Sequence, residues 1–161
     1  MRALRTACET EDVSDLDDLD RALLRLLATD GRRSYTDLAK ETGLSTSAAH
    51  QRVRRLEQRG VLTGYAARID PTAVGLPLTA FVSITPIDPA APDDAPERLA
   101  HLPALEACHS VAGEESYILK VRVGSPGELE TLLQEIRAAA GVSTRTTVVL
   151  STPWEDRTPC P

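Results

Sequence analysis

The chain has 161 residues and a formal net charge of −6, and its length allows two small domains. Its three cysteines are far apart in sequence and form no CxxC pair, so neither a zinc site nor a disulfide framework is expected. No stretch approaches the about 18 apolar residues of a membrane span, and the N-terminus lacks the apolar core of a signal peptide. We therefore expect a cytoplasmic protein with no membrane partner.

An amphipathic helix is expected near residue 16, after a loose polar tail at residues 1–14. Its leucines recur at helical spacing, so one face can be buried. They are Leu16, Leu19, Leu23 and Leu27. Acidic residues crowd the start of this helix, where the helix dipole favours negative charge. We interpret that cluster as helix-start chemistry and not as a metal site. It consists of Asp15, Asp17, Asp18 and Asp20.

Two short helices around a tight turn are expected next. Ser34 can cap the first with its hydroxyl, and Gly43 allows the left-handed conformation that ends it. Ser45 starts the second helix, which would bury one face at 3.6-residue spacing. That face consists of Ala49, Val53 and Leu56. The arrangement predicts a helix-turn-helix.

The other faces of the second helix are small and polar at its start and rich in arginine further on, which suits the DNA major groove. The residues expected to face the groove are Ser45, Thr46, Ser47, His50, Gln51 and Arg54. His50 and Gln51 are the best candidates for base contacts. Residues that would serve phosphates or local ion pairs are Ser34, Tyr35, Arg52, Arg55 and Arg59. For Arg52, near the buried edge of the helix, a structural ion pair is at least as good a reading.

The charge distribution makes this DNA-binding footprint modest. Residues 45–59 hold four arginines and one glutamate, whereas residues 71–161 hold six basic and twelve acidic side chains. One copy should therefore bind DNA weakly, and several copies should be needed.

A small wing is expected after the second helix. Gly60 can end that helix, and two short apolar runs at 61–62 and 65–69 flank a Thr63-Gly64 turn, as in a hairpin. The winged helix-turn-helix would span residues 15–70, with residues 71–77 as a linker.

The second domain is expected at residues 78–151, followed by a tail at 152–161. Strand alternation from residue 78, a short helix at 94–102, strands at 105–111 and 116–123, a helix at 126–140 and a strand at 144–150 give the order βαββαβ. This is a ferredoxin-like αβ-sandwich, so the chain belongs to the α+β class. Apolar residues and threonine on both strand faces predict a dimer through the open face of the sheet.

Catalysis is not expected. Cys108 and His109 could suggest a nucleophile and its base, but adjacent strand residues point to opposite faces. The chain has no Gly-rich phosphate loop, no HExxH and no GxSxG. We expect no enzyme and no cofactor.

Three sequence blocks together resemble the Lrp/AsnC, or feast/famine, transcription regulators. They are LDDLDRALLRLLATDGR at 16–32, DLAKETGLSTSAAHQRVRRLEQRGVLTGYAARIDPTAVG at 37–75 and SVAGEESYILKVRV at 110–123. The resemblance implies a winged helix, an amino-acid-sensing sandwich, dimers through the sandwich sheets, and assembly into octamers or other rings.

The resemblance also implies that the effector binds between dimers, with a contribution from the turn after the second strand. The matching residues are Gly113, Glu114, Glu115, Ser116 and Tyr117. Two positions depart from the family pattern: Ser116 stands where the family often has an aspartate, and Ala49 where a larger aliphatic residue is usual.

Together these features predict a sequence-specific, DNA-binding transcriptional regulator whose DNA binding or assembly responds to a small effector, an amino acid. An effector-independent architectural protein, bound to double-stranded DNA in a salt-sensitive and sequence-tolerant way, remains the alternative. A response of DNA affinity to an amino acid would separate the two.

Overall fold

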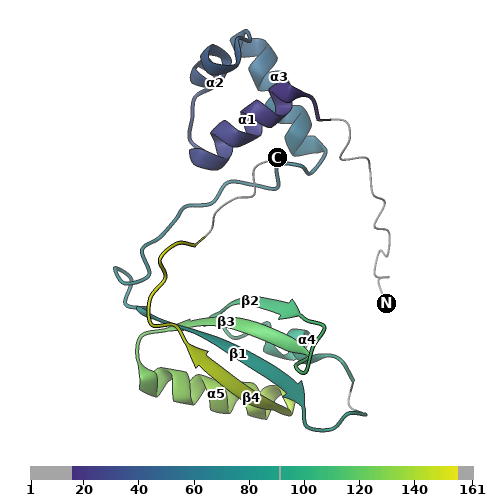
Figure 1. Cartoon of the computed structure of the whole chain (residues 1–161), viewed down its shortest axis with the longest axis vertical. Helices are drawn as coiled ribbons and strands as arrows, with labels where there is room; N and C mark the ends of the chain where they lie inside the picture. Colours follow the sequence, from purple (N-terminus) through teal and green to yellow (C-terminus); the bar gives the residue numbers. More distant parts are fainter. Residues whose placement is uncertain (1–15, 91, 156–161) are drawn as a thin grey trace. The chain divides into compact units, whose positions relative to one another are not determined.

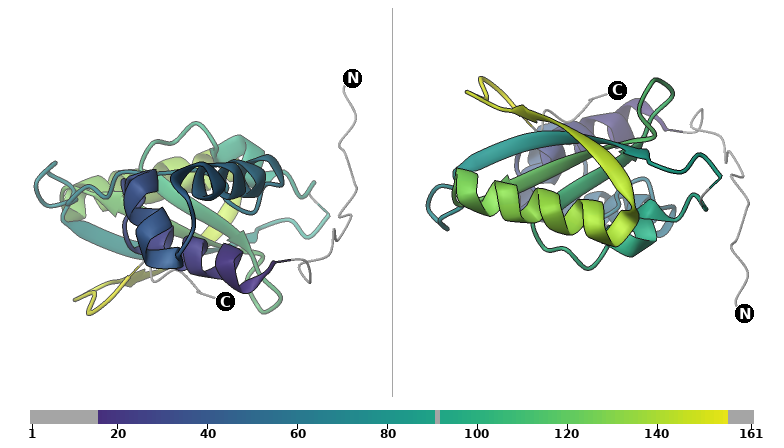
Figure 2. Two further views of the ribbon diagram at one scale, coloured as in Figure 1. Left: turned by 90° about the horizontal axis from the view of Figure 1, so that it is seen from above. Right: turned by 90° about the horizontal axis from the view of Figure 1, so that it is seen from below.

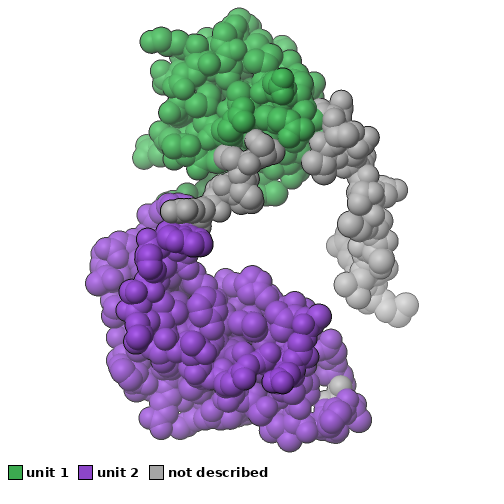
Figure 3. Space-filling view, in the orientation of Figure 1, with its two compact units in different colours: residues 1–67, 156–161 green, residues 68–155 purple. Residues whose placement is uncertain are grey.

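The computed structural model describes residues 16–90 and 92–155. The chain divides into two compact units, one ending at Ala67 and the other spanning Arg68–Glu155 (Figure 3). The predicted tail at residues 1–14, Asp15 of the acidic cluster, and residues 156–161 lie outside the described residues.

The first unit contains three helices, α1 (Asp18–Thr29), α2 (Tyr35–Thr42) and α3 (Thr46–Gln58) (Figure 1). The predicted caps of α2 and α3 are confirmed. Ser34 accepts a hydrogen bond from the backbone N–H of Asp37 at 3.1 Å, and Ser45 accepts one from Ala48 at 3.2 Å. Gly43 ends α2 with a φ of 70°, as its lack of a side chain allows.

The core of this unit lies where the three helices meet. The predicted buried face of α3 is confirmed, since Ala49, Val53 and Leu56 are fully buried. From α1, Leu23 and Leu27 are buried, whereas Leu16 and Leu19 are half-buried. The helix-turn-helix is therefore held by apolar contacts among all three helices.

The predicted wing was wrong, because residues 61–70 form no strand. Val61 and Leu62 instead donate backbone hydrogen bonds to the carbonyl of Leu56, which closes the end of α3. Tyr65 folds back, and its hydroxyl donates to the Glu57 carboxylate at 2.9 Å. A two-stranded hairpin is marginal alone, and here its first run is used as a helix cap.

The second unit has the predicted order βαββαβ: β1 (Leu78–Pro86), α4 (Ala95–Leu99), β2 (Leu105–Ser110), β3 (Tyr117–Val123), α5 (Pro126–Ala140) and β4 (Val142–Val148). The strands form one antiparallel sheet in the order β2-β3-β1-β4. Helices α4 and α5 cover one face of it (Figures 1 and 2).

The core of the second unit lies between that face and the helices. Ala80, Val82 and Ile84 of β1 are fully buried, as the alternation predicted. Leu119 pairs with Val82 in the register and is also buried. Ile136 supplies the centre of α5. None of the helices in the described ranges is both long and apolar enough to cross a membrane.

The opposite face of the sheet is less apolar than predicted. Phe81 is 40% exposed and Ile118 half-buried, but Lys120 and Arg122 follow Ile118 on the same side of β3. Glu155, in the expected tail, pairs with Lys120 at 2.6 Å. Every second residue of a strand lies on this uncovered face of the sheet, and two of the β3 residues on it are charged.

Candidate nucleic-acid interface and effector cleft

The predicted reading face of α3 is exposed. The side chains that lie on it are Thr46, Ser47, His50, Gln51 and Arg54. Arg54 forms no ion pair with any of the described residues, so its guanidinium is available for a phosphate. The Ser47 hydroxyl lies 3.1 Å from that of Ser45, which caps the helix. Small residues therefore occupy the start of α3, and a longer cation lies two turns further on.

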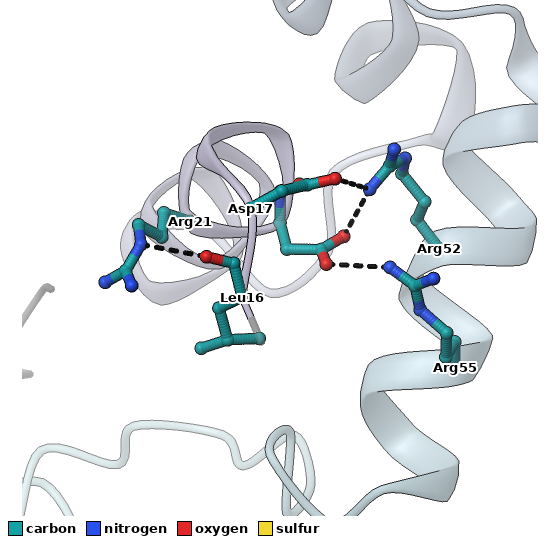
Figure 4. A network of polar contacts seen from close by, with 6 residues as sticks. Leu16, Asp17, Arg21, Arg52 and Arg55 are labelled. Atoms are coloured by element: carbon teal, nitrogen blue, oxygen red, sulfur yellow. Dashed lines mark hydrogen bonds and ion pairs between the residues drawn. The ribbon is translucent and has the colours of Figure 1, made fainter. Parts of the chain in front are cut away.

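Two other arginines of α3 are held by carboxylates of the first helix (Figure 4). Asp20 is fully buried and accepts hydrogen bonds from Arg52 and from Arg55, each at 2.8 Å. Asp17 accepts a further one from Arg52 at 2.6 Å. These four residues, the acid–arginine network, join α1 to α3 behind the reading face.

The network contains one of the two roles expected for Arg52. Its side chain is 25% exposed and pairs with both carboxylates, so the structural ion pair is present. Among the described residues Arg55 pairs with Asp20 alone, and its side chain is 51% exposed. The acidic cluster was read as helix-start chemistry, which holds for Asp17, whose side chain caps α1. Asp20 does more, because it is a buried counter-ion.

Electrostatics agree with this geometry. Hydrogen bonds from the backbone N–H of Asp20 and from Arg52 lower the pKa of Asp17 below its ordinary value. The two carboxylates raise the pKa of Arg52. The charges of Arg52 and Arg55 are therefore neutralised within the unit, and the footprint left for DNA is smaller than the sequence predicted.

The start of α2 lies against α3. The rings of Tyr35 and His50 meet edge to face, with centroids 4.7 Å apart and planes at 87°. The Ser34 hydroxyl donates to the Asp37 carboxylate at 2.6 Å while capping the helix. Ser34 is therefore already engaged within its own helix.

The turn expected to contact the effector borders an open cleft of about 240 Å³. Its lining residues are Ser83, Thr85, Glu114, Glu115, Ser143, Thr144 and Arg145. The Glu115 carboxylate forms an ion pair with Arg145 of β4. An acid, a guanidinium and several hydroxyls thus surround one small polar hollow.

Two other turn residues are engaged elsewhere. Ser116 donates its backbone N–H to the carbonyl of Ile84 at 3.1 Å. Tyr117 is buried, and its hydroxyl donates to Asp93 at 2.6 Å. That hydrogen bond and the burial of the ring raise the pKa of Tyr117 to about 12. Within this one chain Tyr117 is packed in the core beside the turn and does not line the cleft.

Sequence reasoning missed Arg145. The signal was available in the strand alternation, because Arg145 pairs with Ser83 in the register and lies among the exposed positions of β4. Only the fold reveals that this position adjoins a turn 30 residues away in sequence.

The cysteine–histidine pair on β2 has no catalytic geometry. Cys108 and His109 are successive residues and pair with Leu119 and Ile118 of β3 respectively. Burial and the nearby Glu97 raise the pKa of the Cys108 thiol, which disfavours the nucleophilic thiolate.

Family models match both units. Residues 16–57 match the AsnC-type helix-turn-helix domain, and residues 79–159 match the Lrp/AsnC ligand binding domain. The HTH-type transcriptional regulator LrpA of Mycobacterium tuberculosis is 60% identical over 88% of this chain and 95% of its own. The chain belongs to the Lrp/AsnC family. It is a DNA-binding transcriptional regulator that carries a ligand-binding domain.

Other relatives and solved structures of the family agree with this assignment. The leucine-responsive regulatory protein of Salmonella typhimurium is 40% identical over 84% of this chain and 85% of its own length. Among solved Lrp/AsnC structures, the feast or famine regulatory protein of M. tuberculosis complexed with L-methionine has a TM-score of 0.88 and 59% identity, over 91% of this chain and 99% of that one. AsnC of E. coli has a TM-score of 0.80 and 30% identity, over the same shares.

Proposed function

We propose that this regulator reads specific DNA sequences with α3 and that an amino acid bound in its second unit changes DNA binding or assembly. The observation that carries the first part is the exposed polar face of α3, which faces away from the core and from the acid–arginine network. His50 and Gln51 contact bases, and Arg54 contacts a phosphate. Tyr35 and Arg59 lie at the border of this surface, while Arg52 and Arg55 orient α3.

Arg54→Ala tests the phosphate contact. Duplexes selected by the protein from a random-sequence pool serve as the specific probe, and the unselected pool as the non-specific one. Loss of one phosphate contact should weaken binding to both probes and reduce the slope of log affinity against log salt by about one. Arg98→Ala removes an exposed arginine of the second unit and is the matched control. An unchanged slope in Arg54→Ala would remove Arg54 from the contact.

The cleft at the turn suits an amino acid because it offers partners for both charges of the zwitterion. Arg145 is 70% exposed and can donate charge-assisted hydrogen bonds to a ligand carboxylate. Glu114 is exposed and forms no ion pair with a described residue, so it can bind an ammonium group. The backbone N–H groups of Gly113 and Glu114 make no hydrogen bond within the described ranges and can also hold a carboxylate. The solved complex of the M. tuberculosis relative with L-methionine supports this ligand class.

A thermal-shift screen against the twenty amino acids tests the effector. A ligand at 100 times its dissociation constant should stabilise the protein by about 2.7 kcal/mol. Each amino acid that binds is then added to the DNA titration, where a change of affinity is expected. Glu114→Gln should weaken the response, and Glu130→Gln on the exposed side of α5 should not. If no amino acid binds at millimolar concentration, the effector-independent architectural role is the better account.

Assembly through the open face of the sheet completes the proposal. Phe81 is 40% exposed at the centre of that face, between Lys120 and Thr147 in the register. A second copy packed there would bury it, and further assembly to an octamer or another ring would multiply weak DNA contacts. The protein would act in the cytoplasm, where its DNA is. Two-fold symmetry would also present two copies of α3 to a two-fold operator.

Phe81→Glu tests the interface. Introducing a charge at an aromatic position that the dimer would bury should raise the dimer dissociation constant by roughly 30-fold or more, as for an interface hot spot. Sedimentation equilibrium measures the change. Gln134→Glu on α5 adds the same charge on the helix side and should leave the dimer intact. A dimer that persists unchanged in Phe81→Glu would exclude this face.

A further inference from the structure

The contact between Tyr35 and His50 joins the first residue of α2 to the reading face of α3. Their centroids lie 4.7 Å apart and their planes are nearly perpendicular, the arrangement that aromatic pairs prefer. Both side chains are exposed, so the contact adds little to the core. It needs another reason.

The frame around Tyr35 is rigid. Its helix starts at the Ser34 cap, which Asp37 completes with both its backbone N–H and its carboxylate. At the other end Leu44 donates its backbone N–H to Ala39 at 2.9 Å and holds the turn into α3. Leu38, one turn after Tyr35, is fully buried. The Tyr35 ring is therefore presented to α3 from a fixed backbone.

His50 has no comparable support of its own. No hydrogen bond or ion pair joins its imidazole to any residue in the described ranges, and the Tyr35 ring is its recorded aromatic neighbour. An exposed side chain on a helix commonly adopts χ1 near 180° or −60°. Contact with a ring on one side favours the rotamer that makes it. The imidazole is thereby held in one orientation before DNA arrives.

We infer that Tyr35 is a positioning residue for His50, and that it sets base preference at the position His50 reads without itself contacting a phosphate. The inference rests on the proposed function, in which His50 contacts a base. It assigns Tyr35 a role different from the phosphate contact that its place at the start of α2 had suggested. Preorganising a reading side chain improves binding to the correct base because less rotamer freedom is lost on binding.

Two substitutions of Tyr35 separate the roles. Tyr35→Phe keeps the ring and removes the hydroxyl, whereas Tyr35→Ala removes both. If the ring positions His50, the Phe variant should behave like the original protein and the Ala variant should lose discrimination between bases. If the hydroxyl held a phosphate, both variants would bind every sequence more weakly by the same factor.

The experiment measures discrimination as a ratio of dissociation constants at fixed salt. The two probes are a duplex selected from a random pool and the same duplex with the single base pair whose change depends on His50. Tyr35→Ala should reduce the ratio about two- to tenfold. Added to His50→Ala, it should cause no further loss, because the two residues act as one unit. Thr36→Ala, a neighbouring exposed residue of α2, is the control.

Failure of the inference is distinguishable from failure of the proposed function. If His50→Ala reduces discrimination but Tyr35→Ala does not, the positioning role is overturned and base reading by His50 stands. If no base pair depends on His50, base reading falls and the inference falls with it.

A readout in the free protein tests the positioning without DNA. The ring protons of His50 should show a ring-current shift in NMR spectra of the original protein and of Tyr35→Phe. In Tyr35→Ala they should move to the positions of a solvated histidine, while the amide signals of Val53 and Leu56 stay in place and report an intact fold. Unchanged His50 ring signals in Tyr35→Ala would overturn the inference.

Discussion

The two units each contain an acid–arginine contact, and the two contacts are opposite in kind. In the first unit the carboxylate of Asp20 is fully buried between two guanidinium groups. In the second, Glu115 is 18% exposed and pairs with an Arg145 side chain that is 70% exposed. A buried charge is costly to leave unpaired, whereas an exposed pair contributes about 0–1 kcal/mol. A carboxylate and an arginine therefore hold α1 and α3 together in the first unit. In the effector cleft of the second unit, the same two groups can exchange partners.

This difference matches what each unit has to do. The reading helix must present its side chains in one geometry, and its rear is tied to α1 through the fully buried Asp20 carboxylate. The effector cleft must accept and release a charged solute, and an exposed ion pair can open at small cost. Two substitutions test this contrast, and a pH series tests the tyrosine that each unit ties to a carboxylate.

The largest effect is expected from Asp20→Ala. It leaves Arg52 and Arg55 without their shared buried partner, and loss of one side of a buried ion pair should cost about 3 kcal/mol. Hydrogen exchange of the α1 and α3 amides measures the loss in the first unit alone. The amides of β1 and β3 in the second unit should keep their protection.

Asp18→Ala is the matched control for this prediction. Asp18 lies in the same first turn but is exposed, and its carboxylate contributes through the helix dipole, worth about 0.5 kcal/mol. Equal losses from the two substitutions would mean that the acidic cluster acts only as helix-start chemistry and that the network adds nothing.

The role of Asp20 could not be read from local pattern. Its partners are 32 and 35 residues away, so only packing of α1 on α3 reveals them. The helix-start reading was sufficient for Asp17, because capping is a contact within one turn. The role of Arg145 was not predicted for the same reason, because its partner Glu115 lies on a turn 30 residues away in sequence.

The fold itself was largely predictable because periodicity is a local signal that burial enforces. Every helix and strand of the second unit occurs in the predicted order, and α5 covers residues 126–140 as expected. The predicted wing was wrong because the backbone N–H groups of Val61 and Leu62 bind the Leu56 carbonyl at the end of α3. Strand propensity gives no information about such a contact. The dimer through the open face of the sheet stays a prediction, because alternation tells which side a residue faces and not what covers that side.

An intermediate effect is expected at alkaline pH, because each unit has one tyrosine whose hydroxyl donates to a carboxylate, Tyr65 to Glu57 and Tyr117 to Asp93. Partial burial and the Glu57 carboxylate raise the pKa of Tyr65 to about 12, and the hydrogen bond to Asp93 does the same for Tyr117. Both folded-state values lie above the ordinary 10.0, so the stabilisation is complete below about pH 10 and is lost as pH rises toward 12.

Urea unfolding followed by circular dichroism at pH 8 and pH 11 checks this. The urea midpoint of unfolding should be lower at pH 11 than at pH 8. The decrease should be smaller in Tyr65→Phe and in Tyr117→Phe, because the new side chain cannot ionise. Tyr35→Phe, whose hydroxyl donates to no described residue, should lose as much as the original protein. Equal losses in all four proteins would show that other groups cause the alkaline instability.

The smallest effect on stability is expected from Arg145→Ala, and this sharpens the contrast most. Removal of Arg145 should lower the free energy of unfolding by less than Asp20→Ala does, because the Glu115 side chain keeps 18% of its surface exposed and borders an open polar cleft. Binding of the amino acid found in the screen should nevertheless weaken by about tenfold or more, since a charge-assisted hydrogen bond to the carboxylate is lost. Calorimetric titration measures the second quantity and urea unfolding the first. A large loss of stability with unchanged ligand affinity would make Arg145 the counterpart of Arg52, a fastening residue, and would move the ligand away from this cleft.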